Sequence, residues 1–178
     1  TNAANLRDCN EDNCHIENNE CVCLIAANVS ETYYFGEFTL VDYEEAVKWF
    51  KIIAERPKTN NDKRNTSIVR ANFMAGHSYN KLENYQEAIK WHKKAAEIGT
   101  LWAEKRRTNK SVWGESAYYL ERYIKDASSS IAGIYHFGLK NNNQAFKFYL
   151  KAANLGDVTS MYNVGNGYAL GRGALTDY

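Results

Sequence analysis

Small and apolar residues recur along this chain at the three- and four-residue spacing of an α-helix, and they do so in blocks that repeat. Three blocks align without gaps, at residues 43–54, 85–96 and 143–153. In each block a small residue is followed three positions later by an aromatic ring, and five positions after that by an alanine. This spacing places the three side chains on one helical face. We therefore predict three helices, whose alanines let a neighbouring helix approach closely while the aromatic ring fills the adjoining space.

A second helix-periodic block precedes two of these segments and recurs at the end of the chain. The three copies span residues 71–82, 127–138 and 160–171, and each has a small residue three positions before a tyrosine: Gly76 and Tyr79, Ala132 and Tyr135, and Gly165 and Tyr168. We expect a neighbouring helix to cross at the small residue. Gly99 and Gly156 closely follow alanine pairs, as glycines do at helix C-termini. The repeating unit is therefore predicted to be helix, short turn, helix.

These units predict an all-α fold, an α/α superhelical solenoid, because one helix pair cannot bury its own apolar face and must stack on the next. We assign residues 24–178 to a repeat domain of about 3.5 units. The first unit opens with a helix at about 22–35. The last consists of one helix, which either caps the array or precedes further repeats that this sequence does not include. Ala71 and Ala127 are 56 positions apart, whereas Ala127 and Ser160 are 33 apart. An insertion is therefore expected at about 100–126, with an additional helix from Ser111 to Lys125.

Two runs of residues resemble the halves of a Sel1-like repeat, a relative of the tetratricopeptide repeat. The opening half is similar to Ser160-x3-Val164-Gly165-x2-Tyr168-x2-Gly171-Arg-Gly173, and the closing half to Ala88-x2-Trp91-x3-Ala95-Ala96-x2-Gly99. The resemblance covers roughly residues 24–99 and 127–178, and it is weakest in the first unit. It implies a solenoid that acts as a scaffold for protein complexes.

All four cysteines lie within the first 23 residues, which form a separate polar segment. They are Cys9, Cys14, Cys21 and Cys23. This segment has few core-forming residues, and two disulfides would order it by reducing the entropy of the unfolded chain. The even count favours this interpretation. A zinc site that includes His15 fits the spacing less well, and unpaired thiols are the third alternative. Disulfides predict a periplasmic or secreted protein.

A partner-binding surface is expected on the first helix of each unit, which lines the concave side in arrays of this type. Removing the repeat-defining positions leaves a mixture of aromatic, amide, imidazole and cationic side chains: Arg70, Phe73, His77, Asn80, Ser129, His136, Phe137, Tyr162 and Asn166. The insertion supplies a second candidate surface, in which aromatic and apolar residues are interleaved with the basic residues Lys105, Arg106, Arg107 and Lys110. The aromatic and apolar residues are Leu101, Trp102, Trp113, Tyr118, Tyr119 and Tyr123. Such groups can bind a segment of another protein. The alternative is that they are merely solvated.

Charge and motifs argue against several other classes of function. The formal net charge is +1, so the chain lacks the basic excess of a general nucleic-acid binder. No apolar run approaches the roughly 20 residues that span a bilayer. No nucleophile elbow, phosphate-binding loop, dinucleotide fingerprint or paired-histidine metal motif is present. We therefore predict no catalytic residues, no cofactor and no metal.

The sequence thus predicts a protein-binding scaffold that acts outside the cytosol by sequestering or organising a partner protein. Some small proteins of the family resemble immunity proteins that neutralise effectors of the type VI secretion system. The resemblance therefore implies an alternative, in which the partner is a toxin or effector enzyme. An enzyme is a further alternative, as is a single-stranded nucleic-acid binder that uses the cations and aromatic rings of the insertion.

Overall fold

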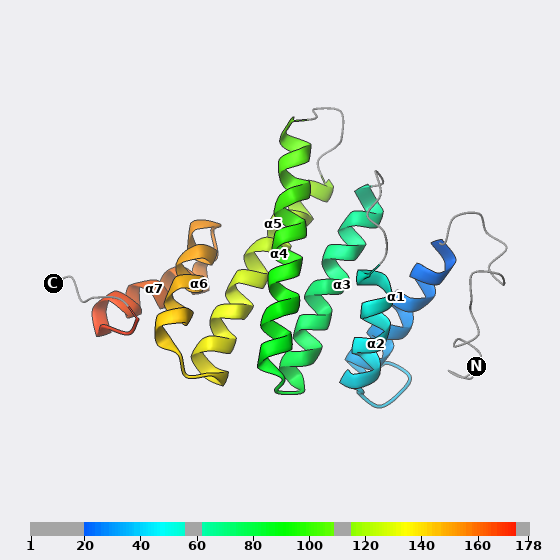
Figure 1. The fold of residues 1–178 in the computed structure, drawn as a ribbon, viewed down its shortest axis with the longest axis horizontal. Helices are drawn as coiled ribbons and strands as arrows, with labels where there is room; N and C mark the ends of the chain where they lie inside the picture. Colours follow the sequence, from blue (N-terminus) through cyan, green and yellow to red (C-terminus); the bar gives the residue numbers. More distant parts are fainter. Residues whose placement is uncertain (1–19, 56–61, 109–114, 174–178) are drawn as a thin grey trace.

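The computed structural model describes residues 20–55, 62–108 and 115–173, and these form a row of packed helices (Figure 1). The helices are α1 (Glu20–Phe35), α2 (Tyr43–Ala54), α3 (Asp62–Lys81), α4 (Tyr85–Thr108), α5 (Glu115–Gly133), α6 (Asn142–Asn154) and α7 (Val158–Leu170). Each helix packs on the next, and α3 also packs on α5. A single π-helical turn, η3 (Ile134–Gly138), extends α5. The predicted sequence of stacked helix pairs is confirmed for the described residues.

The second helix of each unit begins at a polar N-cap. Asp42, Asn84 and Asn141 stand before α2, α4 and α6, and their side-chain oxygens accept hydrogen bonds from the backbone N–H groups of Glu45, Glu87 and Gln144 at 3.0, 3.3 and 3.0 Å. Each bond satisfies one of the N–H groups that a helix start leaves without an intrahelical partner. The caps therefore fix where the second helix of each unit begins.

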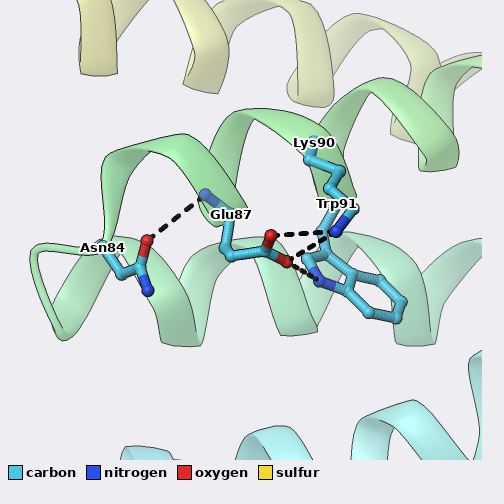
Figure 2. A network of polar contacts seen from close by, with 4 residues as sticks. All are labelled: Asn84, Glu87, Lys90 and Trp91. Carbon is cyan, nitrogen blue, oxygen red and sulfur yellow. Dashed lines mark hydrogen bonds and ion pairs between the residues drawn. The ribbon is translucent and has the colours of Figure 1, made fainter.

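The repeated small residues lie in the core, as the periodicity predicts. Ala46, Ala88 and Ala145 are at most 1% exposed. Trp91 is 4% exposed and its ring stacks on Tyr79, with centroids 6.5 Å apart and planes at 23°. Its indole N–H donates to Glu87 Oε2 at 3.1 Å, and the Lys90 ammonium donates to the same carboxylate at 2.8 Å (Figure 2). One carboxylate thus orients the buried indole and holds a surface cation.

The insertion lengthens two helices and adds no separate helix within the described residues. The apolar positions predicted for an additional helix belong to α5, which runs directly into the first helix of the third unit. Gly99 was expected to follow a helix end, yet it lies inside α4. A Cβ atom at Gly99 would lie 2.9 Å from Ile124 Cγ1. The glycine therefore allows α5 to approach α4 closely, and the helix continues past it to Thr108.

Gly156 does follow a helix end, as predicted. It has a φ angle of +85°, a left-handed conformation that favours glycine. The predictions for the four cysteines fall outside what the structure describes. Cys9 and Cys14 precede the described residues, and Cys21 and Cys23 belong to α1 but have side chains that are not described. The disulfides therefore stay a prediction from the sequence.

Candidate partner-binding groove

A groove with a volume of about 600 Å³ lies between α3 and α5, the first helices of the second and third units. Its lining comes from one face of α3 and one face of α5, which are far apart in the sequence. The lining residues are Thr66, Ser67, Arg70, Phe73, Met74, Tyr119, Arg122, Tyr123 and Asp126. Arg70 and Phe73 were predicted as partner-binding residues. The groove places both on the wall that α3 contributes.

Two half-exposed guanidinium groups flank the groove. Arg70 forms an ion pair with Glu31 of α1, with 2.6 Å between Nη2 and Oε1, and its side chain is 48% exposed. Arg122 lies 3.4 Å from Asp126, one turn further along α5, and is 58% exposed. A guanidinium has five N–H donors in a planar fork, so one carboxylate partner leaves donors available to a ligand.

Aromatic rings form the apolar part of the groove. Phe73 of α3 and Tyr123 of α5 pack against each other in its lining, with ring centroids 5.4 Å apart and ring planes at 57°. Burial raises the pKa of the Tyr123 phenol, although the positive charges of Arg70 and Arg122 act in the opposite direction. The phenol is therefore neutral at physiological pH and can donate a hydrogen bond. The groove therefore combines aromatic rings with two kinds of hydrogen-bond donor. The Tyr123 phenol is a neutral donor, and the guanidinium groups of Arg70 and Arg122 are cationic donors.

Behind Phe73 lie two histidines, of which one had been expected at the surface. His77 contacts Phe73 edge-on at 4.6 Å between centroids, and burial lowers its pKa, helped by Lys81 and opposed by Asp126. His77 is partly buried and is not one of the residues that line the groove. His92 of α4 is fully buried, and burial lowers its pKa to about 3, with a smaller contribution from His77.

The remaining predicted residues do not line the groove. Ser129 is engaged within the fold. Its hydroxyl lies 3.4 Å from that of Ser160 of α7, and Ser160 donates its own proton to Asp157 at 2.7 Å. Burial alone would raise the pKa of Asp157, but hydrogen bonds from Ser160 and Ser129 lower it. Asn80 is partly buried on α3, and Tyr162 and Asn166 are on α7. His136 and the exposed Phe137 are in ring contact in η3. The predicted residues therefore do not form one continuous site.

Of the two tryptophans predicted for a second surface, the structure describes only Trp102. Trp102 is 8% exposed and packs in a core cluster with Ile68 and Leu120. Its side chain fills the space between α3, α4 and α5, so we do not retain it as a partner-binding residue. Trp113 lies outside the described residues.

The face that α5 contributes was predicted only in part: Tyr119 and Tyr123 belong to the aromatic residues of the insertion, whereas Arg122 and Asp126 were missed. Tyr119, Arg122, Tyr123 and Asp126 are spaced three, four and seven positions apart, which places them on one helical side. Which of these residues face α3 depends on how the insertion packs between the second and third units. The spacing along the sequence does not determine this packing.

Two further properties hold for the described residues. No helix among them is both long enough and apolar enough to cross a membrane. No group of three or more His, Cys, Asp or Glu side chains in that part of the chain is placed to hold a metal ion.

The fold and groove define a helical repeat scaffold of the kind that binds other proteins. The Sel1 repeat model matches residues 26–57, 130–157 and 158–178, and a tetratricopeptide repeat model matches residues 69–98. The chain therefore contains Sel1 repeats together with one tetratricopeptide-like repeat. The predicted resemblance is confirmed, with one difference. The weakest predicted unit, the first, matches the Sel1 model, whereas the second matches the tetratricopeptide model.

Among solved structures, the chain is similar to the crystal structure of a Sel1 repeat protein from Oxalobacter formigenes. The two are 23% identical, the match covers 87% of this chain and 67% of that chain, and the TM-score is 0.30. No curated protein matches the sequence.

Proposed function

We propose that this repeat scaffold binds a partner protein in the groove between α3 and α5, and that the bound segment carries both a carboxylate and an apolar side chain. The observation that carries the proposal is the pairing of half-exposed Arg70 and Arg122 with the ring pair of Phe73 and Tyr123 in one groove. Arginine and aromatic residues are enriched where protein interfaces derive most of their binding energy.

The charges favour an acidic segment over a basic one. Each arginine already has one carboxylate nearby, so a ligand carboxylate would add a second acceptor to a fork that has unused donors. A ligand cation would instead meet two guanidinium groups, and like charges at an interface are unfavourable. The apolar side chain of the ligand would lie against Phe73, whose ring already packs on Tyr123 and is thereby held in place.

The test is affinity capture from the native source, with the bound proteins quantified by mass spectrometry. Arg122→Glu reverses one groove charge at an exposed position, and Lys147→Glu makes the same charge change at an exposed position of α6 outside the groove. We expect one partner to be retained by the unmodified chain and by Lys147→Glu, and to be lost from Arg122→Glu. Equal retention by both variants, or recovery of nucleic acid alone, would overturn the proposal.

We also propose that the protein acts outside the reducing cytosol. The support for this location is the clustering of Cys9, Cys14, Cys21 and Cys23 in a polar segment that disulfides would order. Binding and inhibition of a type VI secretion effector is the more specific version of the proposal. Its support is the family resemblance alone, and an effector enzyme among the captured partners, inhibited by the isolated chain, is the result that it requires.

A further inference from the structure

A continuous cluster of four rings reaches from the core to the wall of the groove. The Phe73 ring contacts the rings of His77, His92 and Tyr123, with centroids 4.6, 5.2 and 5.4 Å apart. The two imidazoles also contact each other, with centroids 5.1 Å apart. Phe73 lines the groove, whereas His92 is 0% exposed. A change at the buried imidazole therefore reaches the groove through a single ring, that of Phe73.

The His92 imidazole is buried without polar partners. Neither Nδ1 nor Nε2 has a hydrogen-bond partner in the described part of the chain. Both nitrogens of an exposed imidazole bond to water, and burying them unpaired costs free energy. The cost is larger for the protonated ring, because both nitrogens are then donors and the ring carries a charge. This position therefore holds the neutral form only.

Helix α3 lies directly on the His92 ring. A Cβ atom at Gly76 would be 2.8 Å from both Cε1 and Nδ1 of His92. Gly76 lies between Phe73 and His77 in the sequence, so the three residues of α3 that cover the imidazole occupy one turn of the helix. The imidazole can therefore reach water only if this turn of α3 separates from α4, and such a separation displaces Phe73.

The charges around the cluster come from α3 and α5. Lys81 of α3 and Asp126 of α5 act on His77 with opposite signs, and His77 in turn acts on His92. A proton on His77 would oppose a second proton on His92, because the two rings are in contact. The other ionisable groups at this place act on the Tyr123 phenol, and they are Glu31, Arg70 and Arg122.

We propose that acid opens the contact between α3 and α4 at Gly76 and His92, and that Phe73 moves with α3 and changes the shape of the groove. In the open state the imidazole is in water and has an ordinary pKa of about 6.5. In the closed state burial lowers the pKa of His92 to about 3. Below pH 6.5 the open state therefore binds a proton that the closed state does not. The ratio of open to closed molecules rises about tenfold for each pH unit.

One consequence rests on the function proposed for the groove. A partner that binds the closed groove favours neutral His92, so it is released as the pH falls, because binding and protonation are linked through the same two states. The opening itself needs no partner. It can therefore be tested on the isolated chain, and its failure is distinct from a failure of the capture experiment with Arg122→Glu.

The two methionines of the chain, Met74 and Met161, make the test specific. Met74 lines the groove, and Met161 is on α7. Saturation-transfer NMR of the full chain with ¹³C-methyl methionine detects a minor state that exchanges with the main one on the millisecond timescale. Between pH 7 and 5 we expect the minor population at Met74 to rise about tenfold per pH unit below 6.5. Met161 should show no such change.

Two matched variants identify the titrating group. His92→Gln keeps a polar side chain that cannot be protonated, and it should abolish the pH dependence at Met74. His136→Gln makes the same change in η3, where His136 contacts Phe137 and Tyr149 outside the cluster, and it should leave the pH dependence intact.

Three outcomes would overturn the proposal. The first is a minor population at Met74 that does not change with pH. The second is a minor state that rises at both methionines together, because that result indicates unfolding of the whole chain. The third is a pH dependence that persists in His92→Gln. If His92→Gln does not fold, the first two outcomes still decide the matter on the unmodified chain.

Discussion

His92 lies edge-on to His77 in the core between α3 and α4, with ring centroids 5.1 Å apart and ring planes at 89°. Neither ring nitrogen of His92 has a hydrogen-bond partner in the described structure. A buried imidazole without partners is held in its neutral form, because burial in an apolar environment penalises the charged form. This pair therefore makes the fold sensitive to acid.

The first prediction is a loss of stability as the pH falls below about 6.5. The pKa of His92 is lowered from 6.5 to about 3 in the folded state, so between these values the unfolded chain binds more protons than the folded one. The contribution of His92 is complete above pH 6.5, and it then declines by about 1.4 kcal/mol per pH unit as the pH falls toward 3. Urea unfolding at several pH values between 7 and 4 measures the decline.

The matched variant for this prediction is His92→Leu, which removes the titrating group. Its free energy of unfolding should fall less steeply with decreasing pH than that of the unmodified chain. Parallel curves for the two proteins would show that His92 does not cause the acid sensitivity.

The second prediction concerns two glycines at the same position of the repeat. Gly76→Ala should destabilise the protein by about 1–3 kcal/mol, because the added Cβ would come within 2.8 Å of the His92 ring. Gly165→Ala should stabilise the protein by about 0.5–1 kcal/mol, because nothing lies within 4 Å of its Cβ. Chemical denaturation of both variants and of the unmodified chain compares the two changes. The same sign for both changes would contradict the assigned environments.

The third prediction tests the cap of α4. Asn84→Ala removes the side-chain acceptor of the Glu87 N–H and should cost about 1 kcal/mol of unfolding free energy, whereas Asn84→Asp keeps an acceptor and should cost less. Thermal and urea unfolding of the three proteins measure the difference (Figure 2). If Ala and Asp cost the same, the hydrogen bond would not be the source of the stabilisation.

The fourth prediction concerns the cysteine segment. If Cys9, Cys14, Cys21 and Cys23 form two disulfides, the protein purified without reductant should show no reactive thiol in denaturant, and four after reduction. Reaction with a thiol-specific chromogenic reagent gives the count. Four reactive thiols before reduction would remove the support for a location outside the cytosol, while the repeat domain and its groove would be unaffected.

The helices follow from the sequence because their cause is local. The spacing of Ala46, Ala88 and Ala145 with aromatic rings three positions later predicts both the helices and their buried face, and the structure buries all three alanines. The insertion was harder to predict. The position of Gly99 just after an alanine pair predicts a helix end, yet the close approach of Ile124 is the reason for a glycine there. That contact joins residues 25 positions apart and leaves no mark in the local pattern.

By itself the sequence determined that this protein is an all-helical repeat, because the periodicity of small and aromatic residues is a property of each segment. It also supplied Arg70 and Phe73 as exposed, chemically capable residues. Only the tertiary structure decided which of the candidate residues meet. Helix α5 brings Arg122 and Tyr123 opposite α3, whereas Trp102 turns into the core and Ser129 into contact with α7. The physical reason is that packing between helices sets their relative register and rotation, and it depends on contacts far apart in the chain.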